Sequence, residues 1–153
     1  MAIRAGRASL LQASLAASLC LLAPAGCQDL REYSGDWTGE LSSDPALAHG
    51  FAPGTLISAN VSAASRDGIE LVATWESHSA PFVPIRRASG DVLSEVQLPG
   101  EPLRTFFGFV QPPGEAAYLS IVSLFPENRL ELRLIRGADE AYGVFSLRRT
   151  RAK

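Results

Sequence analysis

Hydrophobic and polar residues alternate with a period of two along most of the chain after residue 33. The clearest case is residues 129–136, where Leu130, Leu132 and Leu134 alternate with charged side chains. Such alternation places successive side chains on opposite faces of a β-strand. The same period predicts eight strands, at residues 34–41, 55–63, 69–76, 92–98, 103–110, 117–124, 129–136 and 141–149.

Glycine, proline and aspartate separate these strands, which recur every 8–12 residues or so, about the spacing of sandwiches and barrels. The dipeptide Asp67-Gly68 predicts a tight hairpin turn. Residues 82–87 include a proline and are at best an edge strand, because proline cannot donate a hydrogen bond to a neighbouring strand. No long helical period occurs. The sequence therefore predicts an all-β fold, namely an antiparallel up-and-down barrel or a barrel-like sandwich of about eight strands.

The first 26 residues have the layout of a secretory signal peptide. Residues 1–7 carry Arg4 and Arg7 and no acid, residues 8–23 are apolar, and small residues follow. The apolar run has 16 residues, whereas a membrane-spanning helix needs about 20. We therefore expect an export signal rather than a permanent membrane span.

Ala25, Gly26 and Cys27 end this segment and resemble the lipobox of bacterial lipoproteins, with Pro24 at the position that is usually leucine. The resemblance implies cleavage before Cys27, a lipid thioether on its thiol and acylation of its freed amine. Two or more acyl chains anchor a protein stably to a membrane. Gln28 follows, where an aspartate would imply inner-membrane retention, so the resemblance implies the outer membrane of the cell envelope. The alternatives are an ordinary cleaved signal and an uncleaved amphipathic N-terminus.

Cleavage at this point predicts a signal peptide at residues 1–26, a lipid-anchored tether at 27–33 and a β-barrel-like domain at 34–150. The remaining 127 residues are enough for one domain with its own core. Removing the two arginines of the signal leaves 12 basic and 16 acidic residues, so the net charge changes from −2 to −4. This charge argues against nucleic-acid binding, which needs a basic surface. Cys20 leaves with the signal and Cys27 carries the lipid, so no thiol remains for a disulfide.

Gly35-Asp36-Trp37 stands near the start of the first predicted strand, and Arg148-Arg149 ends the last one. This layout resembles the calycin pattern that lipocalins, fatty-acid-binding proteins and avidins share. The resemblance implies that Gly35 and Trp37 close one end of a barrel and that an arginine packs across the tryptophan. Arg149 lies on the apolar face of its strand, so it is the expected packing residue, ahead of Arg148.

The segment at residues 105–110 carries more apolar surface than a half-buried strand needs. Phe107 and Phe109 share one face of this strand, and Phe106 and Val110 share the other. If one face fills the interior of the barrel, the other face needs cover. A sandwich-like core that buries both faces of this strand would cover them without any ligand.

The apolar residues of this segment suggest two alternative functions. In the first, the barrel binds a small apolar ligand, and its possible lining is Trp75, Phe107, Phe109 and Leu132. In the second, an outer apolar strip centred on Phe106 and Val110 contacts a partner in an envelope complex, without any small-molecule ligand.

Residue types that carry chemistry form no recognisable catalytic or metal-binding pattern. His49 and His78 lie in loop-like stretches without partners at metal-ligand spacing, and we expect both to be solvated. The sequence contains no nucleophile elbow, P-loop or dinucleotide fingerprint. Charged residues within residues 129–136 indicate a polar outer face. We therefore expect a non-catalytic protein without a metal or cofactor.

Overall fold

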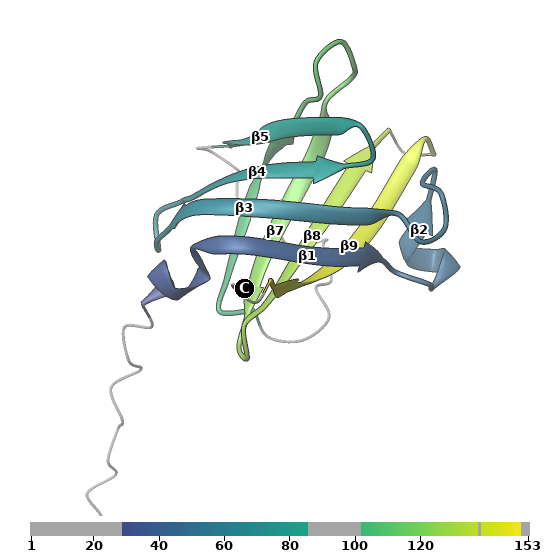
Figure 1. Ribbon diagram of the computed structural model, residues 1–153. Helices are drawn as coiled ribbons and strands as arrows, with labels where there is room; N and C mark the ends of the chain where they lie inside the picture. Colours follow the sequence, from purple (N-terminus) through teal and green to yellow (C-terminus); the bar gives the residue numbers. More distant parts are fainter. Residues whose placement is uncertain (1–28, 86–101, 138, 151–153) are drawn as a thin grey trace, which may run out of the picture.

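The computed structural model describes residues 29–85, 102–137 and 139–150, and its main feature is a closed antiparallel β-sheet (Figure 1). The described strands are β1 (Gly35–Leu41), β2 (Ala48–His49), β3 (Leu56–Ala64), β4 (Ile69–Trp75), β5 (His78–Pro84), β6 (Arg104–Val110), β7 (Tyr118–Phe125), β8 (Arg129–Arg136) and β9 (Ala141–Arg149). Two 3-10 helices accompany them, η1 (Leu30–Tyr33) and η2 (Pro45–Leu47).

Eight of these strands form a barrel in the order β1-β3-β4-β5-β6-β7-β8-β9, and β9 pairs with β1 to close it. The short strand β2 pairs with the start of β9. Each strand of the barrel is antiparallel to the next one along the chain, so the predicted all-β up-and-down barrel is confirmed. The predicted strand at residues 92–98 lies outside the described residues.

The structure corrects the prediction that residues 82–87 are at best an edge strand. β5 lies within the wall of the barrel, between β4 and β6. Pro81 is paired only with β4, and Pro84 is paired only with β6. Each proline therefore has a paired residue on only one of the two neighbouring strands. At such a position the missing N–H does not interrupt pairing with two strands at once.

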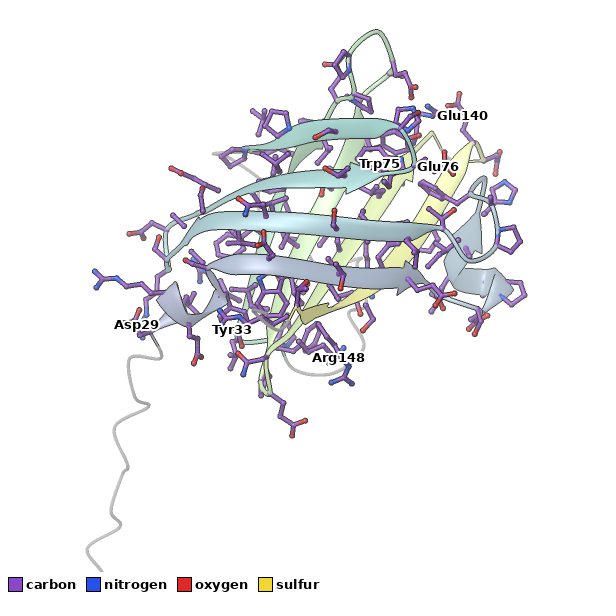
Figure 2. All side chains as sticks on the ribbon, viewed as in Figure 1. Asp29, Tyr33, Trp75, Glu76, Glu140 and Arg148 are labelled. Atoms are coloured by element: carbon purple, nitrogen blue, oxygen red, sulfur yellow. The ribbon has the colours of Figure 1, made fainter. Side chains whose placement is uncertain are left out.

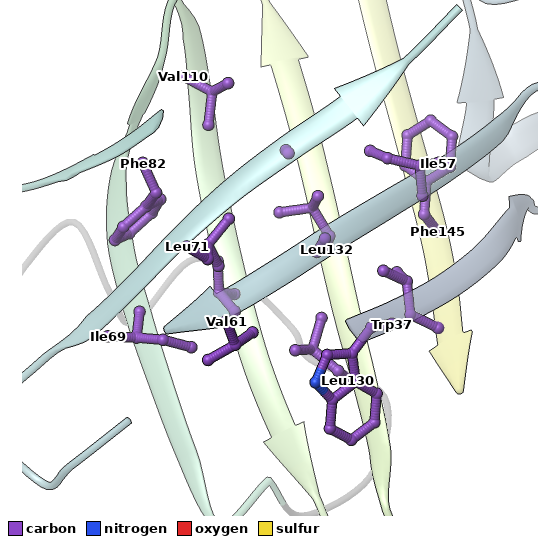
Figure 3. Packing of buried hydrophobic residues seen from close by; sticks show 14 of the residues in the cluster. Trp37, Ile57, Val61, Ile69, Leu71, Phe82, Val110, Leu130, Leu132 and Phe145 are labelled. Carbon is purple, nitrogen blue, oxygen red and sulfur yellow. The ribbon is translucent and has the colours of Figure 1, made fainter. Parts of the chain in front are cut away.

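Inward side chains from all eight barrel strands form one hydrophobic core. β4 shows the alternation in full, with Ile69, Leu71, Ala73 and Trp75 buried and the residues between them exposed. Figure 3 shows side chains from opposite walls meeting inside the barrel, among them Trp37, Ile57, Val61, Phe82, Val110, Leu130, Leu132 and Phe145. Burial of each large apolar side chain stabilises the fold by about 1.5–3 kcal/mol. Buried side chains of the described strands thus crowd the interior of the barrel, as in other small eight-stranded barrels.

The wall around β8 differs from the prediction of a solvated outer face. Glu131 and Arg133 point away from the core, yet they are only 4% and 5% exposed. Arg133 Nε donates a hydrogen bond of 2.8 Å to Glu131 Oε1. A buried charge without its partner is strongly unfavourable, so each of these two side chains depends on the other. The alternation in the sequence correctly indicated their face, but not their burial.

The helix η1 lies within the predicted lipid-anchored tether (residues 27–33) and packs against the barrel. Leu30 and Tyr33 of η1 are buried. The Tyr33 hydroxyl donates to the main-chain carbonyl of Phe125, and Trp37 Nε1 donates to the Tyr33 carbonyl over 2.9 Å. These contacts join η1 to the barrel.

The seam between β1 and β9 generates a prediction about Gly39. A Cβ at this position would overlap the main-chain carbonyl of Ser146 on β9. We expect Gly39→Ala to lower the free energy of unfolding by about 1–3 kcal/mol, because the two strands must move apart. Urea denaturation measures this change. Gly68→Ala is the control, since nothing lies within 4 Å of a Cβ there, and its effect should stay below about 0.5 kcal/mol. Equal effects of the two substitutions would contradict the prediction.

Candidate functional site

The closed end of the barrel is built from Tyr33, Trp37 and Arg149. The rings of Tyr33 and Trp37 stack with centroids 5.8 Å apart and an angle of 8° between their planes. Arg149 Cζ lies 5.5 Å from the centroid of the Trp37 ring, in a cation–π arrangement. Arg149 Nη2 also donates to the carbonyls of Glu32 and Ser34, the latter over 2.7 Å. The guanidinium therefore joins the last strand to η1 across the indole.

Gly35 lies where the chain enters β1 at this end. Its φ of +130° is a conformation that residues with a side chain rarely adopt. A Cβ at Gly35 would also approach the Arg149 guanidinium to 3.9 Å. The structure thus brings together Gly35, Trp37 and Arg149, which are the three residues predicted for barrel closure. Arg148 is exposed on the outer face of β9.

A charged cluster occupies the opposite end of the barrel, where Figure 2 labels Glu140. His78 Nε2 lies 2.5 Å from Glu115 Oε1, Arg136 Nη1 lies 3.8 Å from Glu115 Oε2, and Arg136 Nε lies 3.1 Å from Glu140 Oε2. Glu115 therefore connects the loop after β6 to the first residue of β5 and the last residue of β8. The prediction that His78 is a solvated loop residue is wrong, because it begins β5 and its side chain is half-buried. His49 is exposed, as predicted, but it lies in the strand β2 rather than in a loop.

Aromatic rings lie beside this charged cluster. Trp75 meets Tyr118 edge-on at 5.6 Å, and Phe51 lies 6.0 Å from Tyr118. The Arg136 guanidinium is 4.8 Å from the Tyr118 centroid. Burial raises the pKa of the Tyr118 phenol, and the Arg136 charge partly opposes that rise. Tyr118 therefore stays neutral at physiological pH and packs as part of the core.

The four residues predicted to line a ligand site divide between the two faces of the sheet. Trp75 and Leu132 are buried in the interior, where each packs among other core side chains. Phe107 is half-buried and Phe109 is exposed, and both point outward from β6. The structure therefore does not bring these four residues together around one cavity.

The prediction of an outer apolar strip centred on Phe106 and Val110 is also wrong. Both residues are buried in the core. Gly108 lies between them on the inward face, and a Cβ there would collide with the Phe82 ring. Because this strand is apolar on both faces, the period of two shows which residues share a face but not which face turns inward.

An apolar row crosses the outer surface of β5, β6, β7 and β8. Val83 pairs with Phe109, Phe109 with Leu119, and Leu119 with Ile135. Directly paired residues on antiparallel strands point to the same face, so these four side chains lie next to one another. Val83 is 57% exposed and Phe109 is 44% exposed, and the other two are half-buried. We call these four residues the outer apolar row, which is roughly 14 Å long at about 4.8 Å per strand.

Among the members of the outer apolar row, sequence reasoning named only Phe109 as a candidate site residue. Val83 lies between prolines that weaken the strand signal, and Ile135 lies on the face that carries Arg129, Glu131 and Arg133. The pairing register between strands creates the row, and no periodicity within a single strand reports that register.

The described part of the chain offers neither a metal site nor a membrane-spanning helix. Its His, Cys, Asp and Glu residues form no group of three that could hold a metal ion. None of the helices described here has the length and apolar composition needed to cross a membrane. Cys27 and the lipobox-like segment lie outside the described residues.

Comparisons with known proteins find no match to this chain. No family model, no curated protein and no solved structure matches the chain. The functional argument therefore depends on the geometry of the molecule and on its sequence.

The contacts of Arg149 at the closed end predict that its substitution lowers the stability more than substitution of Arg148 does. We expect Arg149→Ala to lower the free energy of unfolding by about 1–2 kcal/mol, because two main-chain carbonyls lose a charged donor. Chemical denaturation followed by tryptophan fluorescence measures this loss and also reports on Trp37. Arg148→Ala removes the same charge from the exposed outer face and should change the stability by less than about 0.5 kcal/mol. If Arg148→Ala lowers the free energy of unfolding as much as Arg149→Ala, the prediction that Arg149 packs across Trp37 is wrong.

Proposed function

We propose that this chain is an exported, lipid-anchored protein of the cell envelope that acts without catalysis. Its function is to bind a protein partner through the outer apolar row. The row itself carries this proposal, since four uncharged side chains lie together on the outer wall of a small domain. Contiguous apolar surface of this kind marks interaction sites on soluble domains. The closure by Gly35, Trp37 and Arg149 supports a place among calycin-like barrels.

A small apolar ligand inside the barrel has less support. Trp75 and Leu132 already pack within the core, and Phe107 and Phe109 face outward. Such a ligand would have to displace buried side chains, each of which stabilises the fold by about 1.5–3 kcal/mol. Contact with a partner on the outside requires no such displacement.

The proposed anchor gives the barrel an orientation. Cys27 precedes Leu30, the first buried residue in the described part of the chain, by only three positions. Three residues span at most about 10 Å, even when fully extended. A lipid on Cys27 would therefore hold the end closed by Trp37 and Arg149 close to the bilayer. The outer apolar row would then stand on the side wall, accessible to a neighbouring envelope protein.

The anchor is tested on membrane-extracted protein by intact mass. We expect the mass of residues 27–153 plus acyl chains for the wild type, and no acylated product from Cys27→Ala. Cys20→Ser is the matched control, because this cysteine leaves with the signal peptide and its replacement should not affect acylation. A soluble, unmodified wild-type product would rule out the anchor.

The partner surface is tested by placing a photo-crosslinking aromatic residue at position 109 in the native membrane. We expect a discrete protein adduct from Phe109 and none from the same residue at Ser62, which is exposed on β3 outside the outer apolar row. Val83→Ser should weaken the adduct by roughly threefold to fivefold, since about 1 kcal/mol of apolar burial is lost. Adducts with lipid alone, or equal adducts from both positions, would contradict a protein partner at this surface.

A further inference from the structure

A second surface lies on the outside of β1, β3 and β4, away from the outer apolar row. It is an open groove of about 830 Å³. Thr38, Ser58 and Thr74 occupy one row across its floor, because Thr38 pairs with Ser58 and Ser58 with Thr74. At about 4.8 Å between strands, their hydroxyls form a short polar ladder.

The next row of the groove places an apolar side chain between two acids. Glu40 pairs with Leu56, and Glu76 directly follows Trp75, which pairs with Ile57. Leu56 is 68% exposed, although it lies between two charged neighbours. Among the described residues, no ion pair includes Glu40 or Glu76. The groove therefore combines an exposed aliphatic surface with two carboxylates that can accept hydrogen bonds.

The position of Glu76 is not explained by the turn in which it lies. Glu76 has a φ of +50° at the first position of the loop between β4 and β5. Glycine is the usual residue where a two-residue hairpin loop needs a positive φ at this position. A residue with a side chain is less stable in this conformation. The carboxylate is thus held at the edge of the groove in spite of the local backbone preference.

We propose that this groove binds a lysine or arginine side chain presented by an extended segment of a partner protein. Such a side chain has an aliphatic stem and a cationic head. The stem matches Leu56, and the head can reach the carboxylates of Glu40 and Glu76 in charge-assisted hydrogen bonds. The Thr and Ser hydroxyls of the floor suit the polar backbone of the extended segment.

Charge also orients the proposed partner segment. Arg148 of β9 pairs with Thr38, so a cation stands at the β9 edge of the groove. The partner's own cation is therefore repelled from that edge and attracted toward Glu40 and Glu76. Because the groove and the outer apolar row involve different residues, this proposal does not rest on the proposed function.

The test uses the purified full chain, whether it is recovered from the membrane or from the soluble fraction, and a short fluorescent peptide of alternating lysine and serine. We expect saturable binding by fluorescence anisotropy, weakened by added salt because exposed charges are screened. The double variant Glu40→Gln with Glu76→Gln should bind the peptide about tenfold more weakly, since two charge-assisted contacts are lost. Leu56→Ser should weaken binding severalfold, and Phe109→Ser should leave it unchanged.

Two controls distinguish specific binding in the groove from non-specific electrostatic attraction to an acidic protein. The double variant Asp67→Asn with Glu127→Gln removes the same two charges from exposed turns elsewhere on the barrel. It should retain the affinity of the wild type. A peptide of alternating glutamate and serine should not bind. The proposal is overturned if both double variants lose affinity equally, if the acidic peptide binds as well, or if neither peptide binds.

Discussion

The pairing of the last strand with the first is the constraint on which the rest of this structure depends. β9 and β1 lie at opposite ends of the folded chain, yet they share a continuous ladder from Trp37↔Arg149 to Leu41↔Phe145. Without this ladder, both strands would expose unpaired backbone groups along their edges. The same closure places Arg149 over Trp37 and brings η1 into the core through Tyr33.

Buried side chains crowd the inside of this barrel, and its outer wall carries side chains of varied chemistry. Large side chains from all eight strands occupy the inside, so side-chain alternation assigns the remaining positions to the outside. Two parts of that outside differ in chemistry. The outer apolar row on β5 to β8 is uncharged, whereas the groove on β1, β3 and β4 carries acids beside hydroxyls. One small domain thus presents two surfaces of different chemistry.

The wall is not equally well paired around the barrel. β5 pairs with β4 over its first half and with β6 over its second half, whereas β6 pairs with β7 along the whole of Arg104–Val110. Local opening of a protein begins where backbone pairing is sparse, so β5 is the strand expected to open first. Val83 of the outer apolar row lies on this strand, and Glu115 contacts its first residue, His78.

The amino-acid sequence by itself determined the all-β class, the up-and-down order and seven of the eight described barrel strands, and its resemblance to the calycin pattern implied that Gly35, Trp37 and Arg149 meet at one end. The period of two and the turn residues are local properties, so they needed no tertiary information. Only the tertiary structure decided that Phe106 turns inward and Phe109 outward, because a strand that is apolar on both faces carries no internal sign of its inner face. It also decided the burial of Glu131 and Arg133 and the alignment of the outer apolar row. Register between strands depends on closure of the whole barrel, and closure joins residues that are far apart in the chain.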